Sequence, residues 1–202
     1  MTKTRGVLLL IAMVIGASIW GGAAQAGQAF MNTTGRTTQP IGHYEFCQRE
    51  PVQCRQKTAA GAPFELTRKL WAEIVDVNNT VNIMVSPRTD AEMWGREEYW
   101  SYPTKVGDCE DYALEKRRRL MQLGIPAGNL LMTVVRQPNG EGHAVLTVHS
   151  SRGDFVLDNL EPRVLAWGDT DYTYLKRQSE KNSGTWLAID DGRSAVAVGS
   201  VK

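Results

Sequence analysis

The sequence predicts an α+β protein in which a helix that carries a cysteine packs on an antiparallel β-sheet. Segment 109–123 has apolar residues at helical spacing and ends at a glycine. Three apolar segments with alternating polarity follow it, at 130–136, 143–149 and 154–158, and short turns join them. Because the helices precede the strands instead of alternating with them, the order is typical of the α+β class.

The first 26 residues have the layout of a secretory signal peptide. Lys3 and Arg5 precede an uncharged, mostly apolar stretch at 7–20, and the Ala-Gln-Ala of 24–26 is a small-x-small cleavage signal. An uncleaved membrane anchor is the alternative, but Gly, Ala and Gln replace Leu and Ile in the second half of the uncharged stretch. We therefore expect cleavage after Ala26 and export of the mature chain.

The remaining chain has the length of one domain with its own core. Segment 27–62 begins with residues rich in Thr, Gly and Gln, so we expect a loosely held N-terminal arm followed by the domain at 63–202. The 202 residues carry a formal net charge of +1, which gives no reason to expect nucleic acid or an anionic surface as a partner.

Two helices and an aromatic loop are predicted before the sheet. Leu66, Leu70 and Ile74 form an apolar stripe in a helix over 63–77, and the polar residues at 78–80 should end that helix before a short strand at 81–85. Four aromatic residues without a clean period lie among charges in the segment 87–103, which we expect to be a loop packed over the site.

The second helix and the strands have clearer boundaries. Asp108 is a suitable N-cap for the helix over 109–123, and its basic run at 116–119 is expected to be a solvated face. Asn139-Gly140 favours a hairpin between the first two strands, and another strand is expected at 186–189.

Three cysteines in an exported protein leave one thiol over after pairing. Cys47 and Cys54 are close enough in sequence to close a short disulfide loop in an oxidising compartment. Cys109 would then be the free thiol. Because it lies between carboxylates and just after a glycine, the sequence favours a reactive cysteine over a buried, inert one.

Cys109, His143 and Asp158 are the residue types that nucleophilic catalysis by a thiol requires. A cysteine needs a base to become a thiolate, and the base needs a partner that fixes its tautomer. At the start of a helix, the dipole and an adjacent imidazolium would lower the thiol pKa, and the backbone amide could hold an oxyanion. His143 opens the second strand and Asp158 ends the third, so the sequence predicts a cysteine hydrolase. His43 and His149 are weaker candidates for the base.

Three carboxylates surround the predicted nucleophile and need an explanation of their own. Asp108, Glu110 and Asp111 form a cluster of hard oxygen ligands that suits Ca²⁺. Negative charge beside Cys109 opposes thiolate formation, and a cation would cancel that effect. Spacing alone also allows the simpler interpretation that Asp108 caps the helix, Glu110 favours its first turn and Asp111 is solvated.

The chain resembles the bacterial transglutaminase-like cysteine proteinase family. The matching segments are Phe46-Cys47-Gln48-Arg49 with Cys54, Trp100 with Pro103, Gly107-Asp108-Cys109-Glu110-Asp111-Tyr112-Ala113, Gly142-His143-Ala144-Val145-Leu146 and Asp154-Phe155-Val156-Leu157-Asp158-Asn159. They extend over most of the mature chain, and the segment around Cys109 is highly specific.

This resemblance implies a papain-like fold with Cys109 as nucleophile, His143 as general base and Asp158 as its orienter. It also implies a periplasmic, calcium-dependent endopeptidase in which Asp108 and Glu110 bind the metal ion. The protein substrate would be a surface adhesin or another exported protein, with an inner-membrane cyclic-di-GMP receptor as a possible sequestering partner.

The same three residues allow other activities. A transglutaminase would pass the thioester to an amine, and a cell-wall amidase would act on peptidoglycan peptides, because the triad fixes acyl transfer but leaves the acceptor open. A non-catalytic, calcium-responsive binding module with a relic site is an alternative of a different class.

Overall fold

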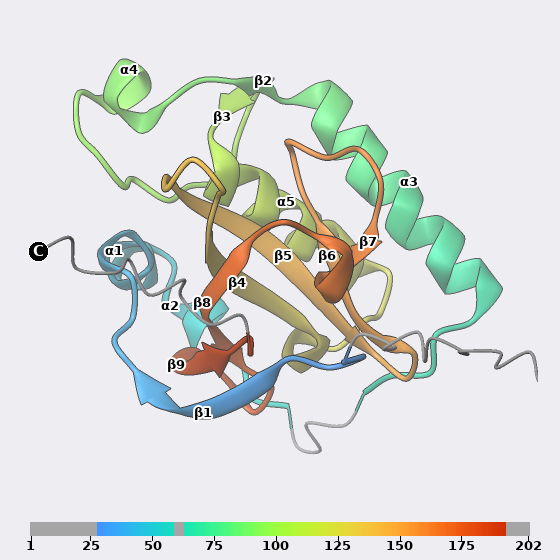
Figure 1. Cartoon of the computed structure of the whole chain (residues 1–202). Coiled ribbons are helices and arrows are strands. Elements are labelled where there is room, and N and C mark those ends of the chain that lie inside the picture. Colours follow the sequence, from blue (N-terminus) through green and yellow to red (C-terminus); the bar gives the residue numbers. More distant parts are fainter. Residues whose placement is uncertain (1–27, 59–62, 193–202) are drawn as a thin grey trace, which may run out of the picture.

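The computed structural model describes residues 28–58 and 63–192. The predicted signal peptide lies outside these residues. A seven-stranded sheet with antiparallel pairing throughout is the centre of the fold, and helices cover it, so the predicted α+β class is confirmed (Figure 1). In spatial order the strands are β1 (Asn32–Thr37), β9 (Asn182–Asp190), β8 (Thr173–Ser179), β4 (Leu130–Arg136), β5 (Gly142–Ser150), β6 (Gly153–Leu157) and β7 (Leu165–Ala166).

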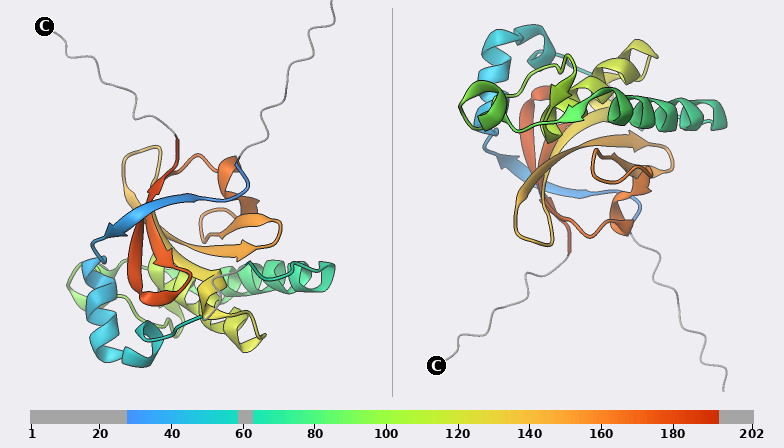
Figure 2. Two further views of the ribbon diagram at one scale, coloured as in Figure 1. Left: turned by 90° about the horizontal axis from the view of Figure 1, so that it is seen from below. Right: turned by 90° about the horizontal axis from the view of Figure 1, so that it is seen from above.

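The helices gather on one side of the sheet, and β1 is an edge strand of that sheet, paired with β9 (Figure 2). A short parallel pair, β2 and β3, joins the segments on either side of α4. The helices and these two strands are α1 (Ile41–Arg49), α2 (Pro51–Cys54), α3 (Arg68–Met84), β2 (Ser86–Pro87), α4 (Asp90–Trp94), β3 (Val106–Gly107) and α5 (Cys109–Gln122), with single 3₁₀ turns at Ala127–Asn129 and Trp167–Asp169.

Helix α5 packs on α3 and on β5 through apolar side chains. Its Leu120 is fully buried in the larger of two cores, together with Ile74 of α3 and Leu146 of β5. A second core lies around Val145, Val156 and Trp167, which come from the sheet and the 3₁₀ turn that follows β7. The helix that begins with Cys109 is therefore fixed against the central strands, where apolar burial supplies most of the stabilisation.

The predicted boundaries of α3 are wrong at both ends. Thr67 caps the helix by accepting a hydrogen bond from the Leu70 amide, and the predicted strand at 81–85 belongs mostly to the last helical turn. Asn78 and Asn82 do not break the helix, because their side chains donate to the carbonyl oxygens of Pro162 (3.0 Å) and Asp158 (2.8 Å). These tertiary hydrogen bonds outweigh the low helix propensity of asparagine.

The segment expected to be a loose N-terminal arm contains an edge strand, β1, that pairs with β9. A polar edge strand lacks the apolar alternation that identifies a strand in sequence. The disulfide between Cys47 and Cys54 is present, with an S–S distance of 2.00 Å. The expected aromatic loop at 87–103 contains helix α4, and the sheet also includes β7 and β8, which the sequence did not reveal.

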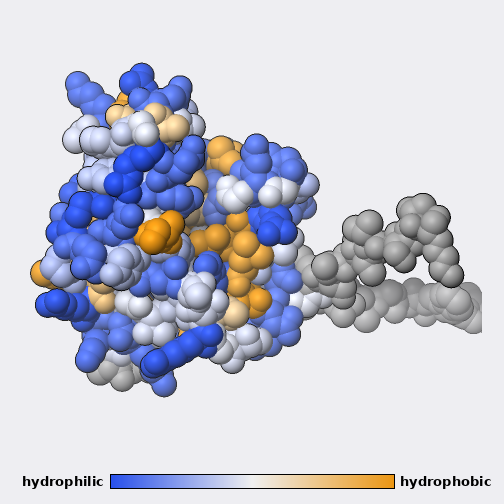
Figure 3. Space-filling view, turned by 90° about the vertical axis from the view of Figure 1, so that its left-hand side faces the viewer, coloured by the Kyte–Doolittle hydropathy of each residue, from blue (hydrophilic) through white to orange (hydrophobic). Residues whose placement is uncertain are grey.

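The surface of the described chain is mostly hydrophilic on the face drawn in Figure 3, where apolar residues gather mainly in a central band with a few more apart from it. Among the described residues, no helix combines the length and the apolar character that a membrane crossing needs.

The basic run of α5 is only half solvated, contrary to the expectation from sequence. Arg118 and Arg119 form ion pairs with Glu115, but Lys116 and Arg117 are buried. The Nζ of Lys116 has no hydrogen-bond partner among the described residues, and burial lowers its pKa to about 7, against a weaker opposing effect of the Asp158 charge.

We predict that Lys116→Met stabilises the fold by about 1–4 kcal/mol at pH 7, because it removes a buried amino group that has no hydrogen-bond partner among the described residues. Above pH 7 the unfolded chain binds more protons at Lys116 than the folded chain, so the stability of the native protein should rise with pH until about pH 10. Urea unfolding at several pH values measures both effects. The exposed Lys69→Met is the control, and an unchanged pH slope in Lys116→Met would contradict the prediction.

Candidate active site

Cys109 is the first residue of α5 and lies partly exposed in a cleft of about 500 Å³. His143 lines the same cleft from β5, and Trp100, Ile41 and Lys176 contribute to its walls. The backbone amide of Ala144 donates to the Sγ of Cys109 at 3.4 Å. The residue next to His143 therefore contacts the thiol directly, because α5 packs on β5.

His143 and Asp158 form a buried hydrogen-bonded pair. The distance between His143 Nε2 and Asp158 Oδ1 is 2.8 Å, and the two residues are 5 % and 2 % exposed. His143 is the second residue of β5, and Asp158 directly follows β6, so the antiparallel pairing of these strands brings them together. With Nε2 occupied by Asp158, Nδ1 is the ring nitrogen left to serve Cys109. All three predicted residues thus lie in one site.

The carboxylate of Asp158 is surrounded by donors. Its Oδ1 also accepts from the Leu160 amide at 3.0 Å, and its Oδ2 accepts from the Tyr172 hydroxyl at 2.5 Å. Burial alone would raise the pKa of Asp158, but the hydrogen bond and charge of His143 and the other donors bring it below its ordinary value. Asp158 is therefore ionised at neutral pH and can stabilise an imidazolium. Tyr172 was not identified from sequence, because nothing in its spacing connects it with Asp158.

The electrostatic setting of Cys109 differs from the expectation of a lowered thiol pKa. Burial, followed by the charge of Glu110, raises the pKa of Cys109 well above its ordinary value. The Sγ of Cys109 lies 3.1 Å from Glu110 Oε2. The helix dipole is outweighed here by burial first, and then by the two carboxylates adjacent in sequence, Glu110 and Asp108.

The carboxylate cluster has a different membership from the one expected. Oxygens of Asp90, Asp108 and Glu110 lie within 4.8 Å of one another, whereas Asp111 turns away and accepts from the Ser101 amide at 2.7 Å. Asp108 occupies the N-cap position of α5, yet its side chain does not cap the helix. Instead, its Oδ2 accepts from the Asp90 amide at 3.1 Å, so the capping interpretation is wrong. Asp90 was missed because it lies eighteen residues earlier, in α4.

The cluster has the properties of a site for a hard cation. Burial and mutual repulsion raise the pKa of Asp108 to about 6 and that of Glu110 to about 9. One buried oxygen of Asp90 and one of Asp108 have no hydrogen-bond partner among the described residues. Buried carboxylates normally find donors, and unsatisfied oxygens facing one another are what a calcium ion coordinates.

The two other histidines, His43 and His149, are each held by contacts with residues other than Cys109. His43 is buried between Trp100 and Trp186, and burial together with the Arg117 charge lowers its pKa to about 3. His149 is paired with a carboxylate of its own, because its Nδ1 lies 2.6 Å from Asp154 Oδ1. Neither histidine lines the cleft that contains Cys109.

Comparisons with known proteins give a family match and several similar structures. The model of the bacterial transglutaminase-like cysteine proteinase family matches residues 33–194. Calcium-bound LapG from Legionella pneumophila has a similar structure, with a TM-score of 0.52 and 22% identity over 80% of this chain and 88% of that chain. A second LapG structure has a TM-score of 0.50 and 23% identity (75% and 82% covered), and an EGTA-treated one has 0.50 and 22% (79% and 87%). A search of curated proteins finds no match.

We predict that iodoacetamide in calcium-containing buffer alkylates Cys109 faster than a free small thiol at pH 7, because a cation in the carboxylate cluster offsets the negative charge that opposes thiolate formation. His143→Ala should slow this reaction by about 10²-fold or more, because the imidazole takes the thiol proton. Mass spectrometry of the labelled peptide measures the rate. His149→Ala is the matched control, since this residue also pairs with an aspartate but lies outside the cleft. Alkylation of Cys109 no faster than that of the free thiol would indicate a relic site.

Proposed function

This chain belongs to the bacterial transglutaminase-like cysteine proteinase family, and we propose that it is an exported, calcium-dependent endopeptidase that releases a cell-surface or periplasmic protein. A cysteine peptidase acts on a protein substrate. What we propose in addition is the location of the enzyme, its dependence on calcium and the kind of protein that it cleaves. The observation that carries the proposal is the buried His143–Asp158 pair next to Cys109.

In the proposed mechanism, His143 Nδ1 takes the proton of Cys109, and the thiolate attacks the carbonyl carbon of the scissile peptide bond. The Cys109 amide at the start of α5 helps to hold the oxyanion. His143 then protonates the leaving amine, and a water molecule hydrolyses the thioester. Asp158 stays ionised throughout and holds His143 in one orientation.

Calcium is the cofactor we propose for the cluster of Asp90, Asp108 and Glu110. Asp90 and Asp108 would each offer an oxygen that has no hydrogen-bond partner among the described residues, and Glu110 would add a carboxylate oxygen from the same cluster. When bound, calcium supplies positive charge that offsets the repulsion among the carboxylates and their effect on the Cys109 thiol. The calcium-bound state of the similar LapG structure supports this assignment.

Export to the periplasm is proposed from the signal-peptide layout of the first 26 residues. A surface adhesin as substrate, and an inner-membrane cyclic-di-GMP receptor as a sequestering partner, are proposed from the family resemblance around Cys109, His143 and Asp158. Transfer of the acyl group to an amine, or action on cell-wall peptides, would use the same three residues, and product analysis distinguishes them.

We predict that replacing Cys109 with Ala abolishes the release of at least one protein fragment from the cell surface or periplasm. Quantitative proteomics of fractionated cells, with wild-type protein and Cys109→Ala, identifies the substrate by its new termini. A hydrolytic product without an incorporated amine supports proteolysis. Release of muropeptides without any protein cleavage would instead support the amidase, and a purely cytoplasmic location of the enzyme would contradict export.

We predict that calcium raises the melting temperature of the purified protein by roughly 5–10 °C when it is present at about 100-fold above its dissociation constant. Asp90→Asn and Asp108→Ala should lose this gain, because each removes a ligand. Asp76→Asn, at an exposed position on α3, is the control. Titration calorimetry measures binding independently of activity, and unchanged calcium binding by Asp90→Asn would remove this residue from the site.

A further inference from the structure

Tyr172 contacts two of the three proposed catalytic residues. It lies directly before β8, and its hydroxyl donates to Asp158 Oδ2 at 2.5 Å. Its ring centroid lies 5.5 Å from that of His143, with the two planes at 58°. One side chain from the far end of the chain therefore touches both the base and its orienting carboxylate.

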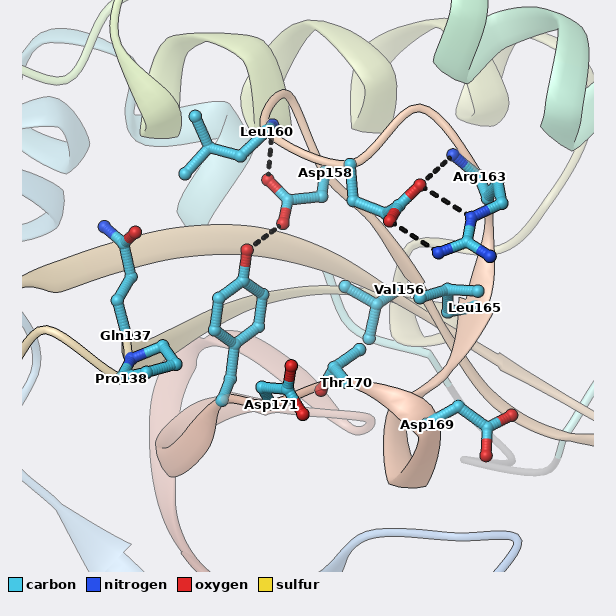
Figure 4. A pocket seen from close by; sticks show the side chains of 12 residues that line it. Gln137, Pro138, Val156, Asp158, Leu160, Arg163, Leu165, Asp169, Thr170 and Asp171 are labelled. Atoms are coloured by element: carbon cyan, nitrogen blue, oxygen red, sulfur yellow. Dashed lines mark hydrogen bonds and ion pairs between the residues drawn. The ribbon is translucent and has the colours of Figure 1, made fainter.

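Tyr172 also lies beside Asp158 in the wall of a neighbouring pocket. Asp158 and Tyr172 line a pocket of about 320 Å³, together with Gln137, Pro138 and Leu160 (Figure 4). This pocket is separate from the cleft that contains Cys109. The hydrogen bonds of Leu160 and of the tyrosine hydroxyl to Asp158 are drawn in Figure 4 as dashed lines. Without the hydroxyl, Oδ2 would be open to water in the pocket.

The two oxygens of Asp158 are thus held from different directions. Oδ1 accepts from His143 and from the Leu160 amide, so these bonds alone would leave the carboxylate able to pivot about Oδ1. The hydroxyl of Tyr172 fixes Oδ2 and removes this freedom. A fixed carboxylate plane fixes the direction of the Nε2–H bond and hence the direction of Nδ1.

We propose that Tyr172 is a positioning residue of the peptidase reaction, locking the Asp158 carboxylate and the His143 ring so that Nδ1 faces Cys109. This inference rests on the proposed roles of the three residues. Tyr172 touches neither the thiol nor the position of the scissile bond, so it acts only through its two neighbours.

The charges around Asp158 suit this role. His143 faces it from β5, Lys116 acts on it from α5, and Glu161 follows it in the next loop. Burial, followed by the hydrogen bond to Asp158, raises the pKa of Tyr172 far above neutrality, so its hydroxyl keeps its proton and donates. The same hydrogen bond favours the ionised form of Asp158, which should therefore protonate at higher pH when the hydroxyl is removed.

The test compares Tyr172→Phe with the wild-type protein in calcium-containing buffer, with iodoacetamide as the probe. We expect alkylation of Cys109 to slow about 10-fold at pH 7, in line with other losses of a supporting hydrogen bond. The acid limb of the alkylation rate against pH should move to higher pH. The proton resonance of His143 Nε2–H should broaden or shift upfield, which a purely structural role would not produce.

Two further variants make the result interpretable. Tyr174→Phe removes another hydroxyl of the same segment, which contacts Thr170 and not Asp158, and should react within about twofold of wild type. Tyr172→Leu also removes the ring beside His143 and should react more slowly than Tyr172→Phe. Circular dichroism confirms that each variant is folded.

The possible outcomes separate this inference from the proposed function. Rapid alkylation in the wild type and equally rapid alkylation in Tyr172→Phe, with an unchanged His143 resonance, would overturn the role of Tyr172 alone. Equal slowing in Tyr172→Phe and Tyr174→Phe would also overturn it, because the effect would then be general. A wild-type thiol without enhanced reactivity would instead overturn the proposed catalytic triad.

Discussion

The hydrogen bond between His143 and Asp158 is the interaction on which the site depends. It joins the start of β5 to the residue that follows β6, and both partners are almost fully buried. The antiparallel register of these strands brings the two residues together, and α5 brings Cys109 to the same place by packing on β5. An ionised carboxylate at this depth requires donors, and each donor in turn restricts the geometry of the imidazole.

The same structure places negative charge where a thiolate would form. Asp90, Asp108 and Glu110 share a small volume beside Cys109, and burial strengthens their repulsion. The repulsion among these carboxylates lowers the stability of the fold, and their charge opposes ionisation of the Cys109 thiol. A single bound cation would therefore favour both the fold and the thiolate. The proposed metal site at the start of α5 would thus act on the fold and on Cys109 together.

Local signals in the sequence predicted the parts of the site that lie at ends of regular elements. Asp108 and Gly124 delimit α5, and the hairpin at Asn139-Gly140 places His143 correctly at the start of β5. Long-range polar contacts were not predictable. Asp90 reaches the site from α4. The strand β8 lacks apolar alternation because a polar residue, Gln178, occupies a buried position in it. The Met132 amide donates to the Gln178 side chain, which itself donates to the Ser183 carbonyl oxygen. Such partners become known only when the chain is folded.

Asp158 lies one residue beyond the end of β6, so the ladder of the sheet does not hold it. Its backbone carbonyl accepts from Asn82 of α3, and its carboxylate accepts from Leu160 and Tyr172. Asn82 and Tyr172, which come from other parts of the chain, and the neighbouring Leu160 therefore fix one residue. The helix that was expected to end at 78–80 continues to Met84, and this extension carries Asn82 to the loop that presents Asp158. The extension of α3 beyond its expected end thus occurs where polar tertiary contacts position the Asp158 carboxylate.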